Sequence, residues 1–179
     1  EKHTEKNIFI IPHHTPNFED ERSCKGDKLK RVSYIGLPSQ LDRIDDIDDF
    51  CKSLGLEFSV HNPKTREECI SCLKNTDLGL VYLGKENKWY DEIVKQKPNT
   101  KLTNFQSFGI PTICTKYNSF SEFGGNACIF IDSFEDLKNA IKLMVDDEDL
   151  RQELSDRAYQ NGQNYHIEKI AQLYKKISI

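Results

Sequence analysis

Residues 97–115 read KPNTKLTNFQSFGIPTICT, and this stretch decides the fold class. It predicts a short helix over residues 101–108, which ends at Gly109 because glycine readily forms the left-handed cap and Pro111 cannot continue a helix. Residues 112–115 follow at once and are rich in β-branched side chains, which predicts a strand. A helix that leads directly into a strand is the repeating unit of a parallel sheet covered by helices.

The same alternation extends to both sides of this stretch. Strands are predicted at residues 31–35, 57–61, 79–83, 112–115 and 128–131, each followed by a turn or a helical pattern. Asp45 is expected to cap a helix that ends at Gly55, and Thr65 with Glu68 to form a capping box for the next one. We therefore expect an α/β domain, a Rossmann-like doubly wound parallel sheet with helices on both faces.

The two ends of the chain depart from this pattern. Residues 133–179 are almost wholly helical in pattern, whereas residues 7–12, NIFIIP, form an apolar run suited to a buried strand. We therefore divide the chain into residues 1–30, a linker or crossover strand from a preceding domain, and residues 31–179, the α/β domain. The start at Glu1 and the single methionine, Met144, suggest a piece of a longer protein.

Length and composition limit the classes of function. A chain of 179 residues with 37% hydrophobic and 30% charged residues predicts one globular domain, without an apolar run near the roughly 18 residues of a membrane span. The net charge of −4, with both signs interleaved, offers no basic face, so we expect no nucleic-acid partner. Six scattered cysteines and no signal-peptide pattern favour reduced thiols and a cytoplasmic location.

The first residues of the opening stretch also carry candidate chemistry. Lys97 and Lys101 flank the N-terminus of the predicted helix, where free backbone N–H groups and the helix dipole favour an anion such as a diphosphate. Asn99 and Thr100 lie between the two lysines. Asn104, about one turn into the helix, can offer its amide to a polyol such as ribose. On these residues alone, a surface helix with ordinary lysines is an equally good interpretation.

This segment resembles the donor-site pattern of GT-B glycosyltransferases of the large bacterial family often called glycosyl transferases group 1, or GT4-like. That pattern is a lysine, three residues, then Lys-Leu-x-Glu/Gln-Tyr-x-Ala-x-Gly-x-Pro before a strand. The sequence has matching or similar residues at Lys97, Lys101, Leu102, Phe105, Ser107, Gly109 and Pro111. The resemblance continues in order over most of the chain, through residues 75–83, Glu122 with Gly124 and Gly125, and the C-terminal helices.

The resemblance implies the C-terminal, donor-binding half of a GT-B enzyme that transfers a sugar from a nucleotide-sugar to an acceptor hydroxyl, in glycan or polysaccharide synthesis. It implies that Lys101 and Glu122 act in transfer. It further implies that the donor is held by residues Lys97, Asn99, Thr100, Lys101, Asn104, His61 and Ser119. In the same geometry Arg43 either reaches the phosphates or pairs with the aspartates around it.

The resemblance also sets expectations for partners and cofactors. The donor is a substrate, and no metal or other cofactor is expected. Asp46-Ile-Asp48 and Asp147-Glu-Asp149 match an Asp-x-Asp metal signature, but both lie at predicted helix starts, where aspartates satisfy free N–H groups. The acceptor site, and with it any peripheral membrane association, would lie in a missing N-terminal acceptor domain. We therefore expect this chain alone to bind the donor without turning it over.

Two neutral residues leave a second interpretation open. Gln96 and Asn104 stand where the family has acidic residues, and an amide lacks the charge that makes a carboxylate–diol contact strong. The alternative is therefore a non-catalytic nucleotide-sugar- or glycan-related binding module with a degenerate donor site.

Overall fold

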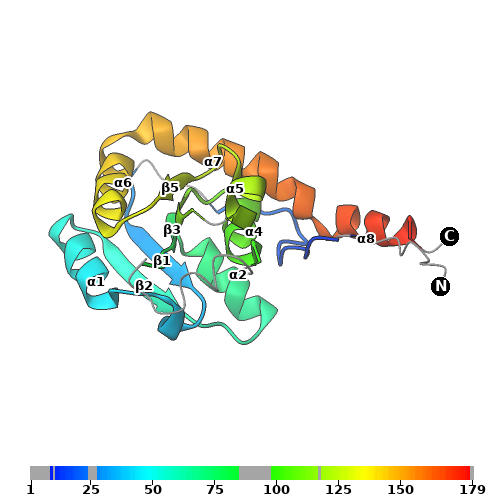
Figure 1. Cartoon of the computed structure of the whole chain (residues 1–179), viewed down its shortest axis with the longest axis horizontal. Coiled ribbons are helices and arrows are strands. Elements are labelled where there is room, and N and C mark those ends of the chain that lie inside the picture. Colours follow the sequence, from blue (N-terminus) through cyan, green and yellow to red (C-terminus); the bar gives the residue numbers. More distant parts are fainter. Residues whose placement is uncertain (1–8, 10, 24–27, 85–97, 117, 178–179) are drawn as a thin grey trace, which may run out of the picture.

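The computed structural model describes residues 9, 11–23, 28–84, 98–116 and 118–177 (Figure 1). Its five strands are β1 (Arg31–Ile35), β2 (Glu57–His61), β3 (Leu78–Val81), β4 (Thr112–Thr115) and β5 (Ile129–Ile131). They form one sheet in the order β2-β1-β3-β4-β5, and every neighbouring pair is parallel. The predicted fold class is confirmed, with β3 ending at Val81 rather than residue 83 and β5 beginning one residue late.

Helices follow the strands as the alternation predicts. Their bounds are η1 (Pro38–Gln40), α1 (Ile44–Ser53), α2 (Arg66–Lys74), α4 (Thr100–Ser107), α5 (Asn118–Gly124), α6 (Phe134–Asp146), α7 (Glu148–Gly162), η2 (Gln163–Tyr165) and α8 (Ile167–Lys175). Among the described residues, no helix is long and apolar enough to cross a membrane.

The helix starts show which capping predictions were right. Arg43, in the left-handed conformation with φ 58°, precedes α1 and provides no side-chain cap, so Asp45 lies inside the first turn instead of capping it. Thr65 accepts a hydrogen bond from the backbone N–H of Glu68 at 3.1 Å, as predicted. Glu68 accepts from the backbone N–H of Lys64 at 2.6 Å, one residue before the position that a full capping box requires.

Side chains of alternate strand residues pack on opposite faces of the sheet. Leu80 and Tyr82 join the core on the face that α1 and α6 cover, whereas Val81 and Leu83 join the core against α2, α4 and α5 (Figure 1). A strand buried on both faces explains why these runs are continuously apolar. The arrangement leaves the ends of the strands as the part of the sheet that a ligand can approach.

The described part of the N-terminal segment crosses the helices and contains no strand. Among the described residues of the run 7–12, none lies in a strand, and Phe9 exposes 59% of its surface, so the predicted buried strand is wrong there. Further along, the Asn17 side chain donates to the carbonyl of Ser107 at 2.7 Å, and the Ser23 N–H donates to that of Phe108 at 2.9 Å. These carbonyls at the end of α4 have no partner within the helix. The hydrogen bonds that they accept hold the N-terminal segment against the domain.

Candidate functional site

The sheet order creates a natural binding edge between β1 and β3. The chain leaves β1 toward β2 on one side and leaves β3 toward β4 on the other, so the connections diverge at their C-terminal ends. Ligands of open α/β sheets bind in the crevice at such a switch point. Gly36 directly follows β1 here, and its N–H donates to the carbonyl of His61 at the end of β2, at 2.7 Å.

Lys101, in the first turn of α4, places its ammonium group at this edge. The group donates a hydrogen bond to the hydroxyl of Tyr34 on β1 and another, at 3.3 Å, to Oε1 of Gln40 in η1. It also lies 4.3 Å from the centre of the Tyr34 ring, within the range of a cation–π contact. The predicted lysine therefore does lie at the strand ends, near a helix N-terminus.

Gly36 provides the room for that ammonium. A Cβ atom at this position would lie 2.5 Å from Nζ of Lys101 and 3.2 Å from the Tyr34 hydroxyl. Its φ of 154° also belongs to a region that side chains rarely adopt. The glycine is thus required both by the backbone and by the lysine.

Tyr34 and Asp42 complete the edge, and the sequence analysis included neither. Tyr34 is buried, and burial, with a smaller contribution from the charge of Asp42, raises its pKa, so the phenol stays neutral. Asp42 accepts a hydrogen bond at 2.9 Å from the N–H of Gly84, which follows β3 in the chain. A tyrosine in the strand before a glycine was the available signal, but nothing in the sequence paired it with Lys101.

A small hollow lies beside the ammonium. It has a volume of about 50 Å³, enough for about one or two water molecules, and it is lined by Ile35, Leu73, Thr100, Lys101, Asn104 and Phe105. Oδ1 of Asn104 is buried and has no hydrogen-bond partner among the described residues. The structure therefore brings Thr100, Lys101 and Asn104 together, as a donor site requires.

Asn99 lies on another side of α4. It is buried against η2, and its side chain lies close enough to the Tyr165 hydroxyl to lower the pKa of that tyrosine. Its Nδ2 makes no hydrogen bond with any described residue. Burial is the main reason that the pKa of Tyr165 rises to about 12, and the charge of Glu122 adds to it. Asn99 and Glu122 are thus neighbours of Tyr165, separate from the hollow beside Lys101.

The remaining predicted residues either lie away from the hollow or are outside the part of the chain that the structure describes. His61 ends β2 and is partly exposed, and Glu122 is exposed on α5. Ser119 belongs to α5, but its side chain lies outside the described part of the chain, as do Lys97 and Gln96 altogether. Their roles in binding stay predictions.

The structure agrees with the second interpretation of Arg43, in which it pairs with a neighbouring aspartate. Its Nε donates to Asp46 at 2.8 Å, and its guanidinium lies 4.1 Å from the centre of the Phe134 ring. Two further carboxylates of the Asp-x-Asp pairs are also engaged, since Asp48 pairs with Lys52 and Asp147 caps α7. Within the described ranges, no three His, Cys, Asp or Glu side chains come together as a metal site.

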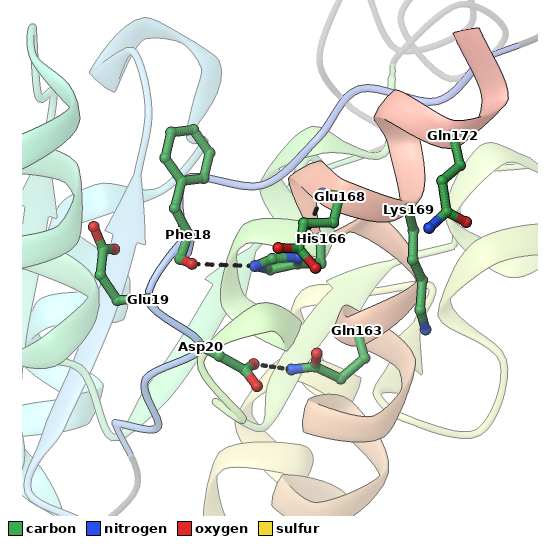
Figure 2. Close-up of a pocket in the computed structure, with 8 residues that line it drawn as sticks. All are labelled: Phe18, Glu19, Asp20, Gln163, His166, Glu168, Lys169 and Gln172. Atoms are coloured by element: carbon green, nitrogen blue, oxygen red, sulfur yellow. Dashed lines mark hydrogen bonds between the residues drawn. The ribbon is translucent and has the colours of Figure 1, made fainter. Parts of the chain in front are cut away.

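A larger pocket lies elsewhere, between the N-terminal segment and the last helices. It measures about 490 Å³ and is lined by Phe18, Glu19, Asp20, Gln163, His166, Glu168, Lys169 and Gln172. Figure 2 shows His166 directed at the backbone of Phe18 and Gln163 directed at Asp20, which ties the two segments together. None of the predicted donor-site residues whose side chains the structure describes lines this pocket.

Comparisons with known proteins bear on the fold. Neither a search of family models nor a search of curated proteins finds a match to the sequence. Among solved structures, HepE from Anabaena in complex with UDP-glucose superposes with a TM-score of 0.56 at 10% identity, over 84% of this chain and 49% of that one. Sucrose-phosphate synthase from Thermosynechococcus elongatus gives 0.60 at 12% identity, over 93% of this chain and 52% of that one.

The chain has the fold of a GT-B glycosyltransferase domain. It spans about half the length of the two GT-B glycosyltransferases that it matches. The resemblance noted from residues 97–111 is therefore confirmed at the level of fold. In this fold the sheet's switch point, Lys101 and the hollow beside Asn104 lie together on one edge.

Proposed function

We propose that this domain is the donor-binding half of a glycosyltransferase and that it holds the diphosphate of a nucleotide-sugar at the edge between β1 and β3. The observation that carries the proposal is the ammonium of Lys101, held at the end of β1 over Gly36 and beside the first turn of α4. A fixed positive charge and a helix N-terminus together favour a phosphate group.

The neighbouring residues suit the rest of a nucleotide. Asn104 has a buried amide oxygen that can accept a hydrogen bond from a ribose hydroxyl, and it lies one turn from Lys101 on the same hollow. His61 ends β2, its carbonyl accepts the N–H of Gly36, and in this proposal it flanks the base. HepE was solved with UDP-glucose, which makes UDP the first nucleotide to test.

In this proposal the domain contributes to transfer by positioning and charge. Lys101 and the N-terminus of α4 stabilise the leaving diphosphate while an acceptor hydroxyl attacks the anomeric carbon. In this proposal Glu122, which is exposed on α5 and whose charge helps to raise the pKa of Tyr165, faces the sugar rather than the phosphates. No metal or other cofactor is assigned, and the acceptor with its general base belongs to a preceding acceptor domain. Glycan or polysaccharide synthesis in the cytoplasm is the setting we propose.

A specific observation favours a second candidate, a non-catalytic nucleotide-sugar- or glycan-related binding module. Asn104 is neutral, and its buried oxygen has no partner among the described residues. A carboxylate there would bind a diol more strongly, so the amide is what a degenerate donor site would contain.

Calorimetric titration with UDP, GDP and ADP tests the proposal. We expect saturable binding of one nucleotide, weakened about tenfold, or about 1.4 kcal/mol, by Lys101→Ala. Lys142→Ala is the matched control, because Lys142 on α6 also lies over an aromatic ring, that of Phe50 at 5.8 Å, but far from the edge. Equal losses in both variants, or no binding of any nucleotide at millimolar concentration, would refute the donor-site assignment.

A further inference from the structure

The contacts of Lys101 single out Tyr34 as more than a core residue. Its hydroxyl accepts a hydrogen bond from the ammonium, and the face of its ring lies 4.3 Å away from the same group. Lysine is a compact charge on a flexible four-carbon stem, so two contacts from one rigid ring restrict it strongly. The site therefore contains a charge whose position is set before any ligand arrives.

Tyr34 is itself fixed on two sides. It lies on β1, the strand between β2 and β3, and only 1% of its surface is exposed. Its hydroxyl proton is directed to the carbonyl of Leu37, at 3.3 Å, in the turn that follows β1. With its proton engaged there, the hydroxyl oxygen presents lone pairs to Lys101.

The chemistry of these contacts preserves the charge of the lysine. A phenol and a glutamine amide are neutral groups, so these two hydrogen bonds hold the ammonium in place without removing its positive charge. Burial raises the pKa of Tyr34, which keeps the phenol in its neutral, proton-bearing form. Donors that are already in place need little rearrangement when the ligand binds.

We propose that Tyr34 is the positioning residue of the donor site, which holds the Lys101 ammonium at Gly36 ready for the diphosphate. The ligand named here rests on the proposed function, whereas the holding of Lys101 by Tyr34 does not. Tyr34 acts through Lys101, so its contribution to binding disappears when the lysine is absent.

A double-mutant cycle measures that dependence. Tyr34→Phe keeps the ring and removes the hydroxyl, and we expect it to weaken binding of UDP and of inorganic pyrophosphate about fivefold, which corresponds to the net contribution of a typical hydrogen bond. In the Lys101→Ala background the same substitution should change neither affinity. Tyr159→Phe is the control, because Tyr159 on α7 loses a hydrogen bond to the Asp20 carbonyl near the other end of α4.

An NMR measurement tests the holding contact without any ligand. In the wild-type protein the ε-methylene protons of Lys101, assigned with Lys101→Arg, should resonate upfield of free lysine because the Tyr34 ring shields them. Addition of pyrophosphate should move this resonance more than that of any other lysine. Thermal unfolding of each variant establishes that it is folded before its affinity is compared.

The outcomes separate this inference from the proposed function. If UDP fails to bind the wild-type chain but the Lys101 resonance is shielded, the nucleotide assignment fails and the positioning role stands. An unshielded Lys101 resonance overturns the positioning role. An equal effect of Tyr34→Phe with and without Lys101, or no effect in its presence, overturns it as well.

Discussion

The edge at Lys101 and the pocket beside α8 differ in almost every property that is used to find a binding site. The α8 pocket has a volume of about 490 Å³ and is lined by acidic side chains together with His166 and Lys169. The hollow at Lys101 has a volume of about 50 Å³, but it lies at the sheet's switch point beside a glycine that makes room for one fixed ammonium. Volume alone therefore favours the α8 pocket, whereas topology, charge and backbone geometry support our proposal for the smaller hollow.

The two regions also differ in what holds them. The α8 pocket is formed where the N-terminal segment is tied to the last helices, through His166 to the Phe18 carbonyl at 3.2 Å and Thr15 to the Tyr165 carbonyl at 3.0 Å. The Lys101 edge is formed by β1, η1 and α4, which belong to the sheet and its covering helices. A site built on the sheet is held more rigidly than one between two surface segments.

The largest effect is expected from Gly36→Ala. A Cβ there would lie 2.5 Å from Nζ of Lys101, a movable group, so we expect the lysine to be displaced and UDP binding to fall by more than about tenfold while the chain still folds. Gly55→Ala is the matched control, because Gly55 has a φ of 72° and open space around it. Both variants should lose about 1 kcal/mol of stability from backbone strain, measured by denaturant unfolding. Unchanged UDP binding in Gly36→Ala would contradict the assignment of the nucleotide to the Lys101 edge.

An intermediate effect is expected from Asn104→Glu. A carboxylate can accept hydrogen bonds from both ribose hydroxyls, so UDP should bind about fivefold more tightly. Pyrophosphate, which has no ribose, should gain nothing, and Asn104→Gln should leave both affinities near those of the wild-type protein. Calorimetry with both ligands distinguishes a ribose contact from a general change at the site. A gain for pyrophosphate as well as UDP would contradict the assignment of Asn104 to the ribose.

The smallest effect is expected from Lys169→Ala in the α8 pocket. Lys169 lines that pocket and none of the hollow at Lys101, so UDP affinity should stay within about twofold of the wild-type value. The same titration checks it. A loss as large as that in Lys101→Ala would mean that the α8 pocket, rather than the sheet edge, binds the nucleotide.

Sequence patterns succeeded where the information was local. The alternation of strands and helices predicted β1, β2 and β4 at their observed bounds, because apolar spacing and turn residues act over a few positions. The cap of α1 was wrong, since Arg43 adopts a left-handed conformation there that no nearby residue signals. The buried strand expected at residues 7–12 is not found at residues 9, 11 and 12, the described part of that run, because apolar character does not reveal which backbone groups will pair.

The candidate site could be predicted in part for the same reason. Thr100, Lys101 and Asn104 lie within five residues of one helix, so their spacing alone placed them on one hollow. Asn99 is equally close in sequence, yet it is buried against Tyr165 on a different side of α4. The rotation of α4 about its own axis decides which side chains face the hollow and which face Tyr165. That rotation is set by the packing of the helix on the sheet.

By itself, the sequence determined the α/β class, the bounds of β1, β2 and β4 and the lysine at a helix start, because each depends on residues close together in the chain. Only the tertiary structure decided that Tyr34 and Gly36, more than sixty residues before Lys101 in the chain, would meet its ammonium. That meeting requires β1 to lie beside β3 and α4 to cover the same edge, an arrangement fixed by burial of apolar side chains on both faces of the sheet.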